Sequence, residues 1–452
     1  MKKKLFYTLL ALVLLPHGCG RADASPGATT LTELPCARGL ERVLDMAVRV
    51  TGGTGASAAV IVPGRGSWSG ASGISEPGTP VTSDMLFDMA SIGKNYLAAL
   101  VLQLVEEGKL GLDDPLHTWL PDYENIDRTI TVRQLLNHTS GIHDFVEHPQ
   151  SPYRTPFDAI DFGAASSPQE VVSTLVGEPY FPPGDGFRYS TTNYVLLRMI
   201  VERVTGSKVS TEIRERFLEP LGLDHTVILD SDAPIPGEYR VAHDWWDADG
   251  DGVLDDVSSR PRTWIATRSP ALIYTTAEDL ARWSQALYGG EVLGQESMAQ
   301  MLTFQRPVPG AAGEPLATGY GLGSQEFRLG GLEMWGHLGW QYGYTSAMLY
   351  LPKRSASITV LINDNNMVLI NLAFFGLWLV VESHLAKARW IAVGASVVLL
   401  LSILVLWPAR GLIRLLRKRK PVQRGTQGGT QSDTERNTEV HREDTEVHRE
   451  GT

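Results

Sequence analysis

Strand-forming segments lie near both ends of the central part of this chain, and helix-forming segments lie between them. Residues 56–73 hold two runs typical of strands around the turn Pro63–Gly66, which predicts a hairpin. Residues 323–364 hold four more such runs, separated by Gly- or Pro-containing turns. In residues 90–305, apolar side chains recur mainly at helical spacing. If both strand sets share one antiparallel sheet, helices must flank it and build a second lobe, which predicts an α+β fold with a crevice between the lobes.

The N-terminus has the three parts of a secretory signal. Lys2–Lys4 are charged, Leu5–Leu15 are apolar, and Ala22–Ala24 forms an A-x-A cleavage site. We therefore predict a signal peptide at residues 1–24. Cys19 leaves open a lipidated cysteine, although the residues before it fit the bacterial lipoprotein pattern poorly.

An uncharged apolar run near the C-terminus, Trp390–Trp407, is about long enough to cross a bilayer, and its terminal tryptophans suit the membrane interface. Basic residues cluster after it, between Arg410 and Lys420, so the positive-inside rule places the tail in the cytoplasm. The sequence thus predicts a globular domain at residues 25–386 outside the cytoplasm and one transmembrane helix at 390–407. Residues 408–452 are predicted to form a tail that is basic and then disordered.

A second apolar segment, Met367–Val381, is shorter. Its length favours a buried or membrane-resting helix of the globular domain over a second membrane span. A second span would also place the domain and the basic tail on the same side of the membrane, which the charge bias disfavours.

Charge and cysteine content exclude some classes of protein. The formal net charge of −11 argues against a nucleic-acid partner, because phosphate binding needs a basic face. The two cysteines, Cys19 and Cys36, offer no disulfide framework, since the first lies in or beside the leader.

Candidate chemistry begins in the stretch FDMASIGKNYLAAL, residues 87–100, where Ser91 and Lys94 are three residues apart at the start of a predicted helix. Side chains at this spacing share one helix face, so Lys94 could take a proton from the Ser91 hydroxyl. The alternative is a Ser91 that caps the helix and a Lys94 exposed to solvent. This stretch alone does not decide between them.

Two later motifs favour the chemical interpretation. Tyr189 follows a Pro-Gly turn, and His337 and Gly339 form H-x-G on a predicted strand. Together with S-x-x-K, in this order, they resemble the signatures of the serine β-lactamase and penicillin-binding family, in its class C β-lactamase and D-alanyl-D-alanine carboxypeptidase branch. The segments ITVRQLLNHTSGI, LEPLGLDHT and TTAEDLARW also resemble stock segments of that family, and the resemblance covers residues 40–366. It implies a β-lactamase/transpeptidase-like fold.

The resemblance implies a role for each matching residue. Ser91 would be the acylated nucleophile, Lys94 its proton partner, and Tyr189 a general base and then a general acid toward the leaving group. His337 would donate a hydrogen bond or charge near Tyr189.

Two residues after His337 would complete the site. Gly339 would keep the backbone clear of substrate. The backbone N–H of Trp340, with that of Ser91, would form the oxyanion hole.

One position departs from the family pattern, which expects Y-x-N. This chain has Thr191 where the asparagine should stand, and Asn193, two residues later, is not taken as its substitute. A threonine offers one hydroxyl on a shorter arm, whereas asparagine offers an amide that both donates and accepts. We therefore expect weaker recognition of a peptide or β-lactam amide and a shift toward esters or other small acyl substrates.

The stretch DADGDGVLDD presents Asp247, Asp249, Asp251 and Asp255 as calcium loops present their ligands. The twelfth position of such a loop is Ser258 rather than glutamate, so this is not an EF-hand. A structural calcium ion and a plain acidic turn both remain open.

A zinc site would draw on the cluster of His138, His143, Glu147 and His148, but the spacing matches no standard ligand pattern. The chain also lacks G-x-S-x-G, which counts against an α/β-hydrolase.

The sequence thus predicts a membrane-anchored extracytoplasmic serine hydrolase that acts through an acyl-enzyme on a small acyl substrate or a cell-wall peptide. It would be β-lactamase- or carboxypeptidase-like, or esterase-like, with no cofactor required for catalysis. The alternative is a weakly catalytic or non-catalytic protein that binds cell-wall peptides or a partner.

Overall fold

The computed structural model describes residues 33–151, 153, 160, 167–229, 235–260, 271–306, 317–329 and 331–385. The chain divides into two units, residues 1–406 and 407–452, and all described residues belong to the first. The predicted signal peptide, transmembrane helix and cytoplasmic tail lie outside the described residues.

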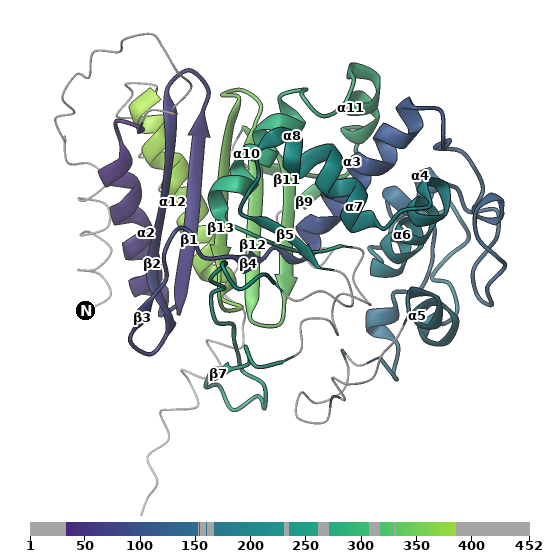
Figure 1. The fold of residues 1–452 in the computed structure, drawn as a ribbon, viewed down its shortest axis with the longest axis horizontal. Helices are drawn as coiled ribbons and strands as arrows, with labels where there is room; N and C mark the ends of the chain where they lie inside the picture. The colour runs from purple at the N-terminus through teal and green to yellow at the C-terminus, as the bar shows by residue number, and fades with distance from the viewer. Residues whose placement is uncertain are drawn as a thin grey trace, which may run out of the picture. The chain divides into compact units, whose positions relative to one another are not determined.

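The centre of the described part is an antiparallel sheet of eight strands in the order β3-β2-β1-β13-β12-β11-β10-β9 (Figure 1). Strands from the two ends of the domain meet in its middle, where β1 pairs with β13 from Ala56↔Ile362 to Ile61↔Ser357. The sheet confirms the predicted hairpin, the predicted meander and their union in one sheet. The strands are β1 (Gly55–Val62), β2 (Gly66–Glu76), β3 (Thr79–Pro80), β9 (Ala317–Tyr320), β10 (Gln325–Leu329), β11 (Leu332–Gln341), β12 (Tyr344–Leu351) and β13 (Ala356–Ile362).

Two helices, α2 (Ala37–Thr51) and α12 (Met367–Leu385), cover one face of the sheet (Figure 1). Apolar side chains such as Leu44, Ile358 and Phe374 fill the space between them and the strands. The helix predicted for Met367–Val381, buried or resting on a membrane, is therefore found in α12, packed on the sheet of the globular domain. In the described part of the chain it is the one helix long and apolar enough to cross a membrane, and 50% of its apolar window is buried in the protein.

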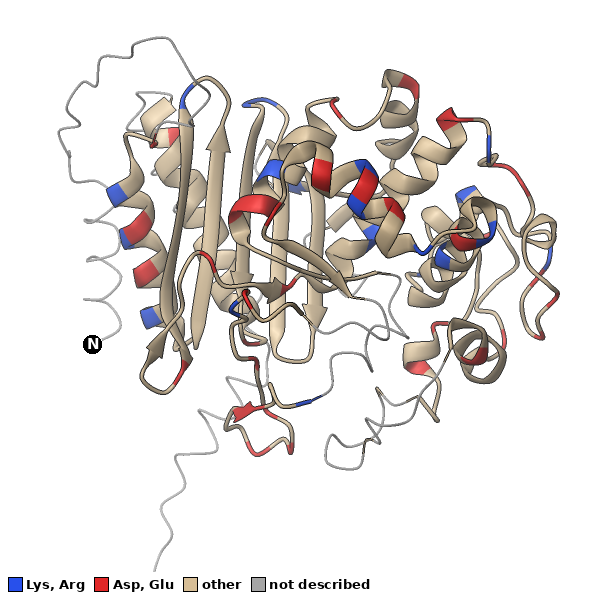
Figure 2. Ribbon diagram, viewed as in Figure 1, with Lys and Arg blue, Asp and Glu red and all other residues tan. Residues whose placement is uncertain are grey.

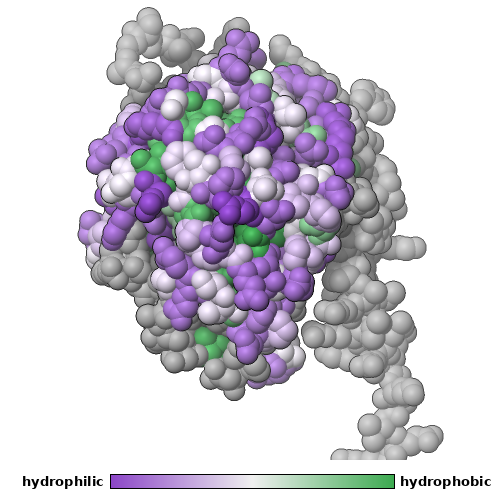
Figure 3. Space-filling view, turned by 90° about the vertical axis from the view of Figure 1, so that its right-hand side faces the viewer, coloured by the Kyte–Doolittle hydropathy of each residue, from purple (hydrophilic) through white to green (hydrophobic). Residues whose placement is uncertain are grey.

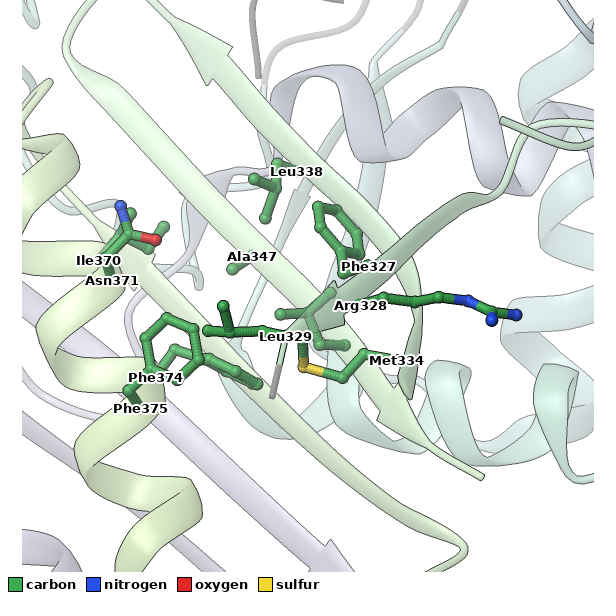
Figure 4. A pocket seen from close by; sticks show the side chains of 11 residues that line it. Phe327, Arg328, Leu329, Met334, Leu338, Ala347, Ile370, Asn371, Phe374 and Phe375 are labelled. Atoms are coloured by element: carbon green, nitrogen blue, oxygen red, sulfur yellow. The ribbon is translucent and has the colours of Figure 1, made fainter. Parts of the chain in front are cut away.

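An apolar pocket lies between α12 and strands β10 to β12, with Phe327, Met334, Leu338 and Phe374 in its wall (Figure 4). These side chains belong to the core shared with α2, whereas α3 and α10 pack into the other core. The pocket is therefore separated by the sheet from the residues considered below.

The other face of the sheet carries α10, and the helical lobe extends beyond it (Figure 1). The indole of Trp283 in α10 stacks on Tyr96 of α3, with ring centroids 3.8 Å apart. The face of the domain in Figure 3 is mostly hydrophilic, with small apolar patches, and charges of both signs are interspersed on the helices (Figure 2). The helices on this side are α3 (Gly93–Glu106), α4 (Val132–Leu136), α5 (Pro168–Leu175), α6 (Thr191–Thr205), α7 (Val209–Ile213), α8 (Glu219–Leu221), α10 (Ala277–Tyr288) and α11 (Gln295–Met301).

Two small sheets position the functional segments. The strands β4 (Phe87–Asp88), β8 (Leu272–Thr275) and β5 (Thr226–Leu229) form one of them, in the order β4-β8-β5, and β4 leads directly into the Ser91 stretch. The strands β6 (Trp245–Trp246) and β7 (Asp255–Asp256) pair at the base of the acidic loop.

Candidate active site

Ser91 lies in a short 3-10 turn, Ala90–Ile92, between β4 and α3. The turn begins at Ala90, whose φ of 52° is unusual for a residue other than glycine. The Asp88 carboxylate stabilises this backbone by accepting the Ala90 N–H at 2.7 Å. The cap positions of the turn and of α3 are Met89 and Ile92, and neither has a side-chain cap hydrogen bond. Ser91 therefore does not cap the helix.

Lys94 is buried rather than exposed. Its side chain lies on the first turn of α3 and the residue is 3% exposed. Its amine nitrogen lies 2.9 Å from the hydroxyl oxygen of Ser91 and 5.1 Å from the centre of the Tyr189 ring. The structure thus brings Ser91, Lys94 and Tyr189 together, with the lysine amine placed to exchange a proton with the serine hydroxyl.

Tyr189 lies just before α6, and a buried histidine supports its ring. The ring of His138 lies 4.3 Å from that of Tyr189, centroid to centroid. Its Nδ1 faces the Ser190 N–H at 3.2 Å and the Asn193 amide nitrogen at 3.0 Å, so Nδ1 accepts. Burial, and then the charge of Lys94, holds the pKa of His138 well below its usual value, so the ring is neutral.

The candidate zinc cluster does not form, because His138, His143, Glu147 and His148 are not among the described residues whose ligand atoms lie close enough together to hold a metal ion. His143 instead stacks on Tyr180 at 5.2 Å, and Tyr180 donates to Glu147 at 2.6 Å. Asn193 is also buried. Its amide nitrogen donates to His138 Nδ1, and its amide oxygen accepts from the Ser140 hydroxyl. These contacts give His138 and Asn193 structural roles around Tyr189.

His337 is fully buried on β11, and its surroundings differ from the expected role. Its Nε2 accepts from the hydroxyl of Tyr320 at 3.0 Å, and its Nδ1 donates to the Leu338 carbonyl. Burial, followed by the charge of Lys94, lowers the pKa of His337 to about 3. The imidazole is therefore neutral and has both nitrogens engaged, so it supplies no charge to Tyr189. Tyr320 was missed because the short strand β9 carries no motif.

Gly339 lies where β11 meets the Ser91 segment. A Cβ added at this position would come within 2.4 Å of the Met89 carbonyl oxygen and 2.3 Å of the Ser346 hydroxyl. Only glycine allows this approach without a shift of the backbone. This close approach brings the next residue, Trp340, near the Ser91 turn. The role of the Trp340 backbone N–H in an oxyanion hole stays a prediction.

Thr191 is the first residue of α6, and its backbone N–H donates to the carboxylate of Asp144. Asp144 also accepts from the Val146 N–H at 3.2 Å and interacts with the charge of Lys94. Burial raises the pKa of Asp144 to about 6 despite these interactions. Asp144 caps the short 3-10 turn Phe145–Glu147. Its position beside α6 depends on the fold, so no sequence motif pointed to it.

The acidic loop brings the carboxylate oxygens of Asp247, Asp249 and Asp251 within 4.8 Å of one another. Asp255 instead accepts the Ala248 N–H at 3.2 Å. The Oδ1 atom of Asp247 is buried and has no hydrogen-bond partner among the described residues. Three of the four predicted ligands therefore fit a divalent cation, and calcium binding stays a prediction.

The buried carboxyl of Asp144 predicts a pH-dependent stability. Its folded pKa is raised, so its stabilising contribution is complete below the unfolded pKa near 4 and is lost as pH rises through about 6. The difference corresponds to about 3 kcal/mol. Asp144→Asn should remove this decline, so the melting temperature of the variant, relative to the parent protein, should rise between pH 4 and pH 7. Parallel melting profiles of the two proteins over this range would contradict the assignment.

The chain is similar in sequence to known proteins. The chain is 27% identical over 298 residues to penicillin-binding protein 4* of Bacillus subtilis, covering 62% of this chain and 61% of that protein. It is 32% identical over 215 residues to esterase EstB of Burkholderia gladioli, covering 45% and 54%. The chain thus spans about half to three fifths of the length of these relatives.

Solved structures extend the likeness to the fold. The D-amino acid amidase of Ochrobactrum anthropi, solved with L-phenylalanine amide, superposes with a TM-score of 0.68 and 27% identity over 77% of this chain and 99% of that one. Residues 42–370 match the family described as Beta-lactamase, which is most of the described domain. With that match and with its serine, lysine and tyrosine gathered at one point, the chain belongs to the β-lactamase family.

Proposed function

We propose that this protein is a membrane-anchored, extracytoplasmic serine hydrolase that acts through an acyl-enzyme on Ser91. The observation that carries the proposal is the 2.9 Å contact between the Ser91 hydroxyl and the amine of the buried Lys94. An isolated serine has no means of losing its proton at neutral pH, whereas one against a buried amine and a tyrosine does. The penicillin-binding, esterase and amidase relatives support a hydrolase.

In the proposed mechanism, the Ser91 oxygen attacks the carbonyl carbon of the substrate while its proton passes to Lys94 or Tyr189. The N–H groups of Ser91 and Trp340 would stabilise the oxyanion. Tyr189 then protonates the leaving group as its bond to the carbonyl carbon breaks, which leaves an acyl ester on Ser91. Water attacks that ester, releases the acid and restores the hydroxyl.

Small esters or other small acyl compounds are the proposed substrates. Thr191 offers no amide near Lys94, and Asp144 places a carboxyl group beside the first turn of α6 instead. A carboxylate cannot donate to the carbonyl of a peptide or β-lactam amide, as the family's asparagine would. The esterase among the relatives supports this preference.

A binding protein of cell-wall peptides remains the second candidate. Thr191 is the feature that favours it, since the departure falls in the amide-recognising motif. The close contact of Ser91, Lys94 and Tyr189 favours the hydrolase, because a protein that only binds has no need to bury a lysine against a serine.

The nucleophile can be identified by trapping. A penicillin or an activated ester should add its acyl mass to the peptide that contains Ser91, and Ser91→Ala should abolish both the adduct and turnover. Lys94→Ala and Tyr189→Phe should each lower kcat by about a hundredfold or more. Ser72→Ala, on the distant strand β2, serves as the matched control. Full hydrolysis by Ser91→Ala would disprove the mechanism, and absence of turnover of every activated ester by the parent protein would favour the binding protein.

The departure at Thr191 can be reversed. Thr191→Asn should raise kcat/KM on a β-lactam or a D-alanyl-D-alanine peptide, relative to a small ester, by about tenfold, because an amide hydrogen bond to the substrate is restored. Thr205→Asn, at the far end of α6, is the control. An unchanged ratio for Thr191→Asn would mean that this position does not set the substrate class.

The membrane topology can be tested in intact cells or spheroplasts. Added protease should digest the domain and spare a tag placed after Lys420, because the predicted signal and helix leave only the tail inside. Western blots with antibodies to the domain and to the tag distinguish the fragments. A domain protected in sealed cells and cleaved only after lysis would disprove the proposed location.

A further inference from the structure

A cluster of aromatic side chains includes Trp340, the residue after Gly339, and these side chains have no part in the proposed chemistry. Trp340 follows Gly339 on β11 and is 47% exposed, which is unusual for so large an apolar side chain. The Trp340 indole lies edge-on to Trp246 of β6 with ring centroids 5.6 Å apart, and Trp246 lies 5.3 Å from the ring of Tyr342. Tyr342 stacks on Tyr153 at 5.7 Å. The cluster therefore runs from the end of β11 to Tyr153, whose ring packs edge-on against Phe145 with centroids 6.0 Å apart.

The cluster is held in a fixed position. Arg260 donates to the Tyr342 carbonyl at 2.6 Å and pairs with Asp244 at 2.6 Å. The two charged side chains are only 4% and 3% exposed, so this ion pair is buried under the cluster. Losing one partner of such a pair is costly, so the pair holds the turn after β11 in place. An exposed aromatic surface on a rigid support is a feature of binding sites.

The geometry of the proposed mechanism decides which part of the substrate the cluster would meet. Tyr189 protonates the leaving group, and its ring lies 6.5 Å from that of His337 on β11. In the proposed mechanism the leaving group lies next to Tyr189, which places it on the His337 side of Ser91. The acyl part of the substrate would then extend the other way along β11, past Gly339 toward Trp340 and toward Tyr342 in the turn after the strand.

We propose that Trp340, Trp246 and Tyr342 form the subsite for the acyl group of the substrate, and that this group is aromatic or bulky and apolar. The inference rests on the proposed function, since it assigns a substrate class to the same acyl-enzyme. An aromatic acyl group would cover the exposed face of Trp340 and pack edge-on or offset against the other rings.

The test compares two esters with the same leaving group, 4-nitrophenyl acetate and 4-nitrophenyl phenylacetate. The parent protein should show a higher kcat/KM for the phenylacetate, and Trp340→Ala and Trp246→Ala should each lower the ratio of the two values by about tenfold or more. Trp340→Phe retains an aromatic face and should keep most of the ratio. Trp378→Ala, which removes a tryptophan from α12 on the other side of the sheet, should leave the ratio as it is in the parent protein. Melting curves confirm that each variant is folded.

The outcomes separate this inference from the proposed function. If the parent protein hydrolyses both esters and the ratio survives in Trp340→Ala and Trp246→Ala, the acyl subsite is disproved and the acyl-enzyme stands. If the parent protein hydrolyses neither ester and Ser91 takes up no acyl group, the proposed function fails and the subsite fails with it. If Trp340→Phe lowers the ratio of the two kcat/KM values as much as Trp340→Ala does, the indole itself has a specific role. That result would disprove the aromatic packing proposed here.

Discussion

The burial of Lys94 against Ser91 is the constraint on which the rest of the site depends. An ammonium group removed from water is costly unless neighbours compensate it, and a buried amine readily gives up its proton. Around Lys94 the protein places neutral rather than charged rings, because burial holds both His138 and His337 in their uncharged forms. The buried carboxyl of Asp144 interacts with the charge of Lys94. A protonated Lys94 therefore has a carboxyl group nearby and meets no imidazolium at His138 or His337.

The fold supplies this arrangement through a few close backbone approaches. The Ser91 turn is joined to the sheet by the Ser346 hydroxyl, which donates to the Met89 carbonyl at 2.7 Å, and by the absence of a side chain at Gly339. The helical lobe contributes Tyr189 and Asp144 from the other side, at the start of α6 and just before a 3-10 turn. Because β1 and β13 pair at the centre of the sheet, the site is assembled from segments more than two hundred residues apart. The local sequence can specify the structure of each segment, but it does not specify which segments come into contact in the fold.

This division explains what could be predicted from the sequence. Hairpins, the meander and α12 are local patterns of alternation, turn residues and apolar length, and they were predicted. Ser91, Lys94, Tyr189, His337 and Gly339 were located by ordered motifs, and the structure gathers them at one point. Tyr320 and Asp144 were missed, because neither lies in a motif and their contacts with the site form only in the fold. His138 was considered only as a metal ligand, because its packing against Tyr189 also forms only in the fold. The sequence located His337 but did not predict its charge state, because the burial that keeps its imidazole neutral is visible only in the structure.

Thr191 stands where the family motif has an asparagine, and Asp144 places a carboxyl group at the start of α6. Together they affect the kind of acyl group that the site can hold. A site that recognises a peptide amide directs the substrate by hydrogen bonds, so a loss of those bonds must be offset by another source of orientation. Trp340 offers such a source, because an aromatic surface orients an apolar group through shape and area rather than through donors and acceptors. We therefore infer that the departure at Thr191 and the aromatic cluster of Trp340, Trp246 and Tyr342 belong to one change, from recognition of an amide to recognition of an apolar acyl group.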